Sequence, residues 1–106
     1  MAKYLLTASY TVEGVRGVMK DGGTKREEAA RSLIESLGGK LHSFYYTHGE
    51  HDVVAVTEFA DTAHALAAVM AVNGSGFVSA STTPLISPAD IDAAAKLHGK
   101  YRAPGQ

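Results

Sequence analysis

The residues best suited to chemistry in this sequence lie between positions 42 and 52. His48, His51 and Asp52 fall within five residues of one another, and His42 precedes them. Histidine titrates near neutral pH and serves as both an acid–base group and a metal ligand. We therefore consider His48, His51 and Asp52 candidate catalytic residues, which would act by general acid–base chemistry.

Two other interpretations apply to the same residues. A metal ion held by His48, His51 and Asp52 is disfavoured, because no HExxH-type spacing on a helix supports it and a turn is well solvated. The plainest alternative is that the histidines lie on an exposed turn while Asp52 accepts hydrogen bonds from backbone amides. We expect no metal and no cofactor.

Strand-like segments flank these residues and must position them. Alternating side chains predict a strand over residues 3–10, and aromatic and β-branched residues predict strands over residues 40–47, 52–59 and 77–85. The run 53–56 is apolar on both sides, so the pattern does not assign its valines to a face of the sheet. The turn over residues 48–51 would join the second and third strands into an antiparallel hairpin.

Four helices are predicted from apolar spacing and capping residues. They cover residues 12–20, 24–37, 62–72 and 88–98. Thr24 and Glu27 should form a capping box at the start of the second helix. Asp61 should cap the third helix, in which Leu66 and Met70 belong to the apolar stripe.

This order of elements predicts an α+β fold of the ferredoxin-like, split βαββαβ kind. Its four-stranded antiparallel sheet would carry the helices on one face. Residues 1–98 would form a single domain, and residues 99–106 a flexible tail. There are no internal repeats or linkers.

The other face of the sheet would be left bare, with few charges on it. The side chains expected there, mostly hydroxyl-bearing and apolar, include Leu5, Thr7, Ser9, Leu41, Ser43, Tyr45, Ser79 and Ser81. A solvated sheet face normally carries Lys, Glu and Arg, so we expect a second copy of the chain to cover this one. The residues Leu5, Thr7, Ser43, Tyr45, Ser79 and Ser81 would form the interface of a homodimer or higher homo-oligomer. The alternative is a monomer whose last helix folds across the bare face.

A small-molecule site is expected on the opposite side, between sheet and helices. Tyr46 would line it, with Thr47 beside it and His42 or His48 at its mouth. The alternative, and the more usual role for such a residue, is that Tyr46 is simply a core aromatic whose hydroxyl reaches the surface.

Composition excludes several classes of function. Ten Lys and Arg residues face eleven Asp and Glu residues, for a formal charge of −1, so no basic field attracts nucleic acid. There is no cysteine, which excludes disulfides and thiolate chemistry. No apolar run of about 18 residues exists to span a membrane, and no secretory signal is evident, so we expect a cytoplasmic protein.

The stretch Tyr46-Thr47-His48-Gly49-Glu50-His51-Asp52-Val53-Val54 resembles the Y-T-x-G-x-Y-D-V-V motif of the GYD-domain family. Thr11 with Gly14, the Gly38-Gly39-Lys40 run, and Glu58 with Asp61 agree with the same family, over roughly residues 3–97. His51 replaces the tyrosine of the motif, and an extra glycine stands near Gly22-Gly23. The resemblance implies a ferredoxin-like fold of the dimeric α+β barrel type and no particular activity.

Two functions follow as hypotheses. The first is an oligomeric small-molecule-binding or interaction module. The second is a cofactor-free enzyme, of oxygenase or isomerase type, that uses His48 or His51 with Asp52 in a pocket between sheet and helices. The identity of the ligand and the existence of a catalysed reaction stay open at this point.

Overall fold

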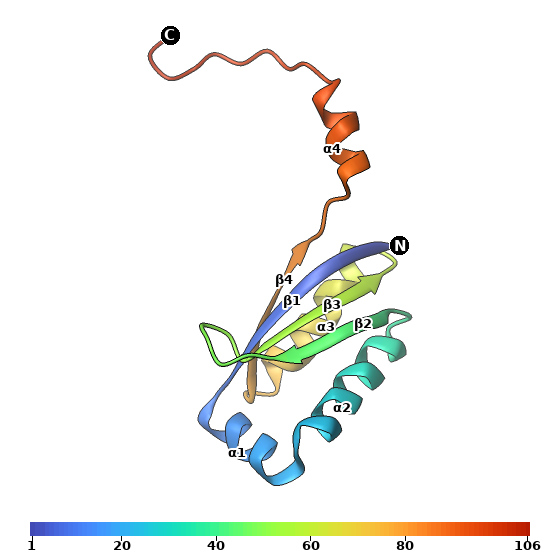
Figure 1. Ribbon diagram of the computed structural model, residues 1–106, viewed down its shortest axis with the longest axis vertical. Coiled ribbons are helices and arrows are strands. Elements are labelled where there is room, and N and C mark those ends of the chain that lie inside the picture. Colours follow the sequence, from blue (N-terminus) through green and yellow to red (C-terminus); the bar gives the residue numbers. More distant parts are fainter.

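The computed structural model describes all 106 residues as four strands and four helices (Figure 1). In chain order the elements are β1 (Ala2–Tyr10), α1 (Val12–Asp21), α2 (Gly23–Ser36), β2 (Lys40–Tyr46), β3 (Val53–Phe59), α3 (Thr62–Gly74), β4 (Val78–Pro84) and α4 (Pro88–Ala95). Every predicted strand and helix is present, with boundaries shifted by at most three residues, the largest shift being at the end of α4.

The four strands form one sheet in the order β2-β3-β1-β4, and every neighbouring pair is antiparallel. This is the strand order of the predicted ferredoxin-like fold. Pro84 ends β4, which is an edge strand, so its missing N–H interrupts no ladder.

Hydrogen bonds define three helix ends and confirm the predicted cap at Asp61. The side chain of Asp61 accepts from the N–H of residue 64 at the start of α3, and that of Ser87 accepts from the N–H of residue 90 at the start of α4. Gly38 follows α2 with a φ of 76°, and its N–H donates to the Glu35 carbonyl. A left-handed glycine in this place ends a helix without steric cost.

The capping box predicted at Thr24 and Glu27 is wrong. The helix α2 begins earlier, at Gly23, and no side chain caps it. Gly22 separates α1 from α2 with a φ of 86°, a conformation that glycine adopts readily. Thr24 therefore lies inside the first turn of α2, where its hydroxyl has no capping role.

One face of the sheet, together with α2 and α3, encloses the core. Along β3 the odd-numbered side chains, from Val53 to Phe59, are buried, while the even-numbered ones are half-buried on the other face. The largest core cluster includes Tyr4, Ile34 and Phe59. This alternation assigns the valines of β3, which the sequence pattern left open.

Leu41 corrects the predicted composition of the bare face. It is buried in the core cluster instead. A β-bulge lies between Leu41, which pairs with Thr57, and Ser43, which pairs with Val56. The extra residue, His42, breaks the two-residue alternation, so Leu41 and Ser43 face opposite sides.

The orientation of α3 also differs from the predicted stripe. Ala65 and Ala68 are buried against the sheet, whereas Leu66 is 48% and Met70 72% exposed. Small side chains let this helix approach the strands closely, which leaves its larger apolar residues facing outward.

The C-terminal segment leaves the body of the protein after β4. Figure 1 shows α4 and the following residues extending away from the sheet, with no helix crossing in front of the strands. The radius of gyration is 17.1 Å, against about 13 Å for a compact chain of this length. Ile91 and Leu97 of this segment are exposed, so α4 does not cover the bare face of its own sheet. No helix is long and apolar enough to cross a bilayer.

Candidate functional site

The loop between β2 and β3 is held together by Thr47 and Asp52. The backbone N–H of Thr47 donates to the Asp52 carbonyl at 2.8 Å, and the Thr47 hydroxyl donates to the His51 carbonyl. The Asp52 carboxylate accepts from the N–H of Tyr10 at 2.8 Å, and the Asp52 N–H donates to the Ala8 carbonyl at 2.8 Å. Asp52 thus ties this loop to the end of β1, as the backbone-anchoring interpretation predicts.

The structure does not assemble His48, His51 and Asp52 into a catalytic group. His48 is exposed and His51 half-buried, and neither side chain makes a hydrogen bond or ion pair. No group of three His, Asp or Glu side chains in the chain is arranged to hold a metal ion.

His42 lies at the other end of β2, away from this loop. Its Nε2 lies 2.7 Å from Oε1 of Glu58. This hydrogen bond holds the pKa of Glu58 below its ordinary value. The pair belongs to the bare face of the sheet, close to Lys3 and Lys40.

Tyr46 packs between β2 and the start of α2. Its hydroxyl donates to the Gly23 carbonyl at 3.0 Å, and its ring meets that of Phe44 edge-to-face at 5.3 Å. A Cβ at Gly23 would lie 2.9 Å from the Tyr46 ring, so glycine permits this contact. Partial burial and the neighbouring Tyr10 hydroxyl raise the pKa of Tyr46 to about 12, against the opposing charge of Arg26.

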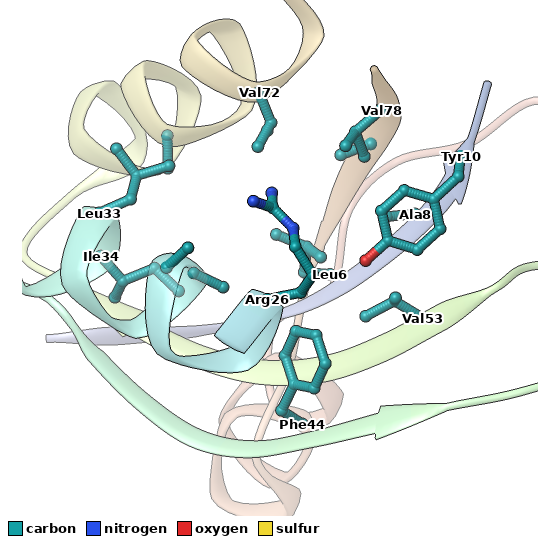
Figure 2. Close-up of a pocket in the computed structure, with 14 residues that line it drawn as sticks. Leu6, Ala8, Tyr10, Arg26, Leu33, Ile34, Phe44, Val53, Val72 and Val78 are labelled. Atoms are coloured by element: carbon teal, nitrogen blue, oxygen red, sulfur yellow. The ribbon is translucent and has the colours of Figure 1, made fainter. Parts of the chain in front are cut away.

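A cavity of about 150 Å³ lies between the sheet and the helices α2 and α3 (Figure 2). All its lining residues except Arg26 are hydrophobic: Leu6, Ala8, Tyr10, Arg26, Ala29, Ala30, Leu33, Ile34, Phe44, Val53, Ala68, Val72, Val78 and Ala80. We call it the inner cavity. It contains no histidine and no carboxylate, so its wall offers binding rather than acid–base chemistry.

Small side chains explain why the inner cavity stays unfilled. Five of its fourteen lining residues are alanines, of which two come from the sheet and three from the helices. On the same face of the sheet, α2 packs on β2 and α3 packs on β4, so the two helices lie over its opposite edges. Over the central strand β1, short side chains such as Ala8 and Ala80 do not reach far enough to fill the space between the two helices.

A wider hollow of about 460 Å³ adjoins the inner cavity. We call it the outer hollow. The two share Tyr10, Arg26, Leu33, Val72 and Val78, and the outer hollow adds Glu13, Gly14, Gly17, Asp21, Ala71, Ser75 and Phe77. It thus lies among α1, α2 and α3, and Arg26 stands where an apolar space meets a polar one.

The predicted ligand-binding residues do not line either space. Tyr46, His42 and Thr47 are all absent from the two walls. His42 is displaced onto the bare face by the bulge, and Thr47 is engaged in closing its loop. Tyr10 and Arg26 line both spaces instead. The alternation of β1 indicates that Tyr10 faces the helices, whereas no pattern in the sequence marks Arg26 as a binding residue.

The bare face of the sheet carries the predicted interface residues. Leu5 pairs with Val56 and Thr83 across β1, and Thr7 pairs with Val54 and Ser81. The hydroxyls of Thr7 and Ser81 lie 3.1 Å apart. The other predicted residues of this face are exposed or half-buried: Ser43, Tyr45 and Ser79. Apart from the corner at Lys3, Lys40 and Glu58, this surface is uncharged.

These features define a small α+β domain with a ferredoxin-like sheet, one bare sheet face, and a cavity under its helices. The GYD domain family model matches residues 4–95, and the chain belongs to this family.

A solved structure described as that of MtbAldR shares the fold, with a TM-score of 0.54 at 19% sequence identity. The superposition covers 97% of this chain but 57% of the other, so this chain spans little more than half of that protein's length. No curated protein matches the sequence.

Proposed function

We propose that this protein is a self-associating module that binds a small molecule in the inner cavity. The observation that carries the proposal is the cavity itself, an apolar space of about 150 Å³ inside a domain of 106 residues. The space is partly open to solvent, so the cost of roughly 24 cal/mol per Å³ for an enclosed cavity gives an upper limit of about 3.6 kcal/mol for the stability that an occupant could add. Domains of this kind are stable by only about 5–15 kcal/mol, so an occupant would contribute a substantial share.

Self-association is supported by the surface of the single chain. Its accessible surface is 7401 Å², whereas a compact protein of 11.1 kDa exposes about 5,700 Å². The excess of about 1,700 Å² exceeds the roughly 800 Å² that each partner loses in an ordinary stable interface. The C-terminal segment accounts for part of this excess, and the uncharged bare face is the surface best suited to meet a second copy. A cytoplasmic location is part of the same proposal.

The cavity is tested with benzyl alcohol as a neutral probe. Wild-type protein, labelled with ¹⁵N, should show saturable shifts of amides that line the inner cavity, among them Ala8, Val53 and Ala80. Replacing Ala30→Phe should fill the space and remove these shifts. The matched variant Ala63→Phe, on an exposed position of α3, should leave them unchanged.

Shifts that survive in the Ala30→Phe protein, or that map to another surface, would contradict the proposal. Thermal unfolding of both variants distinguishes a filled cavity from a misfolded domain. A filled cavity preserves a cooperative transition.

A further inference from the structure

Building on the proposed ligand binding, we infer that the site selects a small monocarboxylate. The compact apolar part of this ligand occupies the inner cavity, and its carboxylate pairs with Arg26. The inference depends on the cavity being a binding site and adds the chemical class of the ligand.

Arg26 is the observation that points to an anion. It is the one charged residue among the fourteen that line the inner cavity. Figure 2 shows its side chain rising from α2 into the middle of the space, with the guanidinium between Leu33, Val72 and Val78. Arg26 is half-buried, and it takes part in none of the three ion pairs of the structure. A guanidinium without a carboxylate partner, set in an apolar wall, is a ready site for one.

The charges around Arg26 favour a single negative charge over two. One guanidinium balances a monoanion, and no second cation lines either space. Glu13 and Asp21, both in the wall of the outer hollow, would repel any anion held at the junction, and a dianion about twice as strongly as a monoanion. A carboxylate therefore suits the site better than a phosphate monoester, which is largely dianionic at neutral pH.

The size of the inner cavity limits the apolar part of the ligand. An engineered apolar cavity of about 150 Å³ in another protein binds benzene. The inner cavity, of similar volume, thus accepts a body of about six carbon atoms, and a longer substituent would extend into the outer hollow. Tyr10, whose ring faces the space from β1 in Figure 2, offers a hydroxyl as a second donor.

Three probes of matched size test the inference by calorimetry and by ¹⁵N chemical shifts: benzoate, benzyl alcohol and phenyl phosphate. Benzoate should bind wild-type protein at least ten-fold more tightly than benzyl alcohol, as expected for a hydrogen bond to a charged group. Phenyl phosphate should bind more weakly than benzoate. Arg26→Met should remove the preference for benzoate while leaving benzyl alcohol bound. Lys25→Met, an exposed neighbour on the same helix, should retain the preference.

The outcomes separate the two proposals. Equal binding of benzoate and benzyl alcohol, or a benzoate preference that survives Arg26→Met, would overturn the inference and leave cavity binding intact. Phenyl phosphate binding as tightly as benzoate would overturn the selection of monoanions. Failure of all three probes to shift the cavity amides would overturn the proposed function together with the inference.

Discussion

Replacing Tyr45→Glu should separate two associated copies of this chain. Tyr45 is 69% exposed on the bare face, where it lies opposite Val54 in the register of β2 and β3. A tyrosine side chain has about 200 Å² of accessible surface, so about 140 Å² of Tyr45 is exposed in the single chain and could be buried in a dimer. At about 25 cal/mol per Å², its burial stabilises the dimer by up to about 3.5 kcal/mol.

Loss of that contribution corresponds to a dimer dissociation constant raised about 300-fold. The carboxylate introduced by Tyr45→Glu would also lie unpaired in an apolar interface, which adds a further desolvation cost. The variant should therefore be monomeric at concentrations where the wild type is dimeric. Circular dichroism should show an unchanged fold, because the side chain leaves no cavity in the core.

Sedimentation velocity across the micromolar range measures this effect. Wild-type protein should sediment at twice 11.1 kDa, or 22.2 kDa, and the Tyr45→Glu protein at the monomer mass. Met70→Glu is the matched control, because Met70 is 72% exposed on α3, on the opposite side of the sheet. A wild type that stays at the monomer mass would refute the reasoning. Dissociation by Met70→Glu alone would place the interface on the helical side.

Three further predictions concern stability and are checked by urea unfolding or NMR. Gly17→Ala should stabilise α1 by up to about 1 kcal/mol, because a Cβ at Gly17 meets nothing within 4 Å. Gly14→Ala should destabilise the protein by about 1–3 kcal/mol, because its Cβ would lie 2.0 Å from a backbone carbonyl oxygen. The opposite order of stabilities would be inconsistent with the packing of α1 on the start of β4. Asp52→Ala should lower the free energy of unfolding by about 1.5–3 kcal/mol, because the hydrogen bond to the end of β1 is lost. Asp52→Asn should lower it less, because an amide oxygen still accepts this hydrogen bond. Equal losses in the two variants would show that the charge of Asp52 matters more than its acceptor oxygen. Hydrogen bonds from the side chain and backbone of His64 lower the pKa of Asp61, so the stability that this cap adds should be present above the ordinary carboxyl pKa and be lost as the pH falls through the lowered value. His64→Ala should move the titration of Asp61, followed by NMR, to higher pH. An unmoved titration would contradict the hydrogen bonds as the cause of the lowered pKa.

The sheet was predictable from sequence because its side-chain period is fixed by strand geometry. Tyr4, Ala8 and Ala80 are buried on the predicted side. The alternation failed only where the chain departs from that geometry, at the bulge that turns Leu41 inward. A bulge has no reliable pattern of side chains, so no periodicity argument anticipates it.

The orientation of α3 was not predictable in the same way. The apolar side chains of α3, which are alanine, valine, leucine and methionine, point in nearly all directions from its axis, so its sequence defines no single apolar face. The structure resolves the ambiguity by steric fit, with Ala65 and Ala68 toward the sheet. Close approach of the backbone was favoured over burial of the larger Leu66 and Met70.

The candidate site was the least predictable part, because a cavity is a property of the distances between elements. The residue types of the loop with His48 and His51 predicted catalysis there, but its Asp52 carboxylate accepts a hydrogen bond from the backbone of Tyr10. The inner cavity arises from alanines on four elements, β1, α2, α3 and β4, and none of these alanines marks a site by itself. Arg26 became distinctive only when the fold placed it between the inner cavity and the outer hollow.

The two proposed surfaces meet in the single strand β3. Val53 and Ala55 face the core, and Val53 lines the inner cavity, while Val54 and Val56 face the bare side. A slip of one residue in register would exchange these sets and expose the core side chains. The strand is fixed at one end by Asp52, bonded to β1, and at the other by Phe59, which is fully buried. The hydrogen bonds of Asp52 thereby hold both the wall of the inner cavity and the face proposed to meet a second copy, so one loop would support both proposed functions.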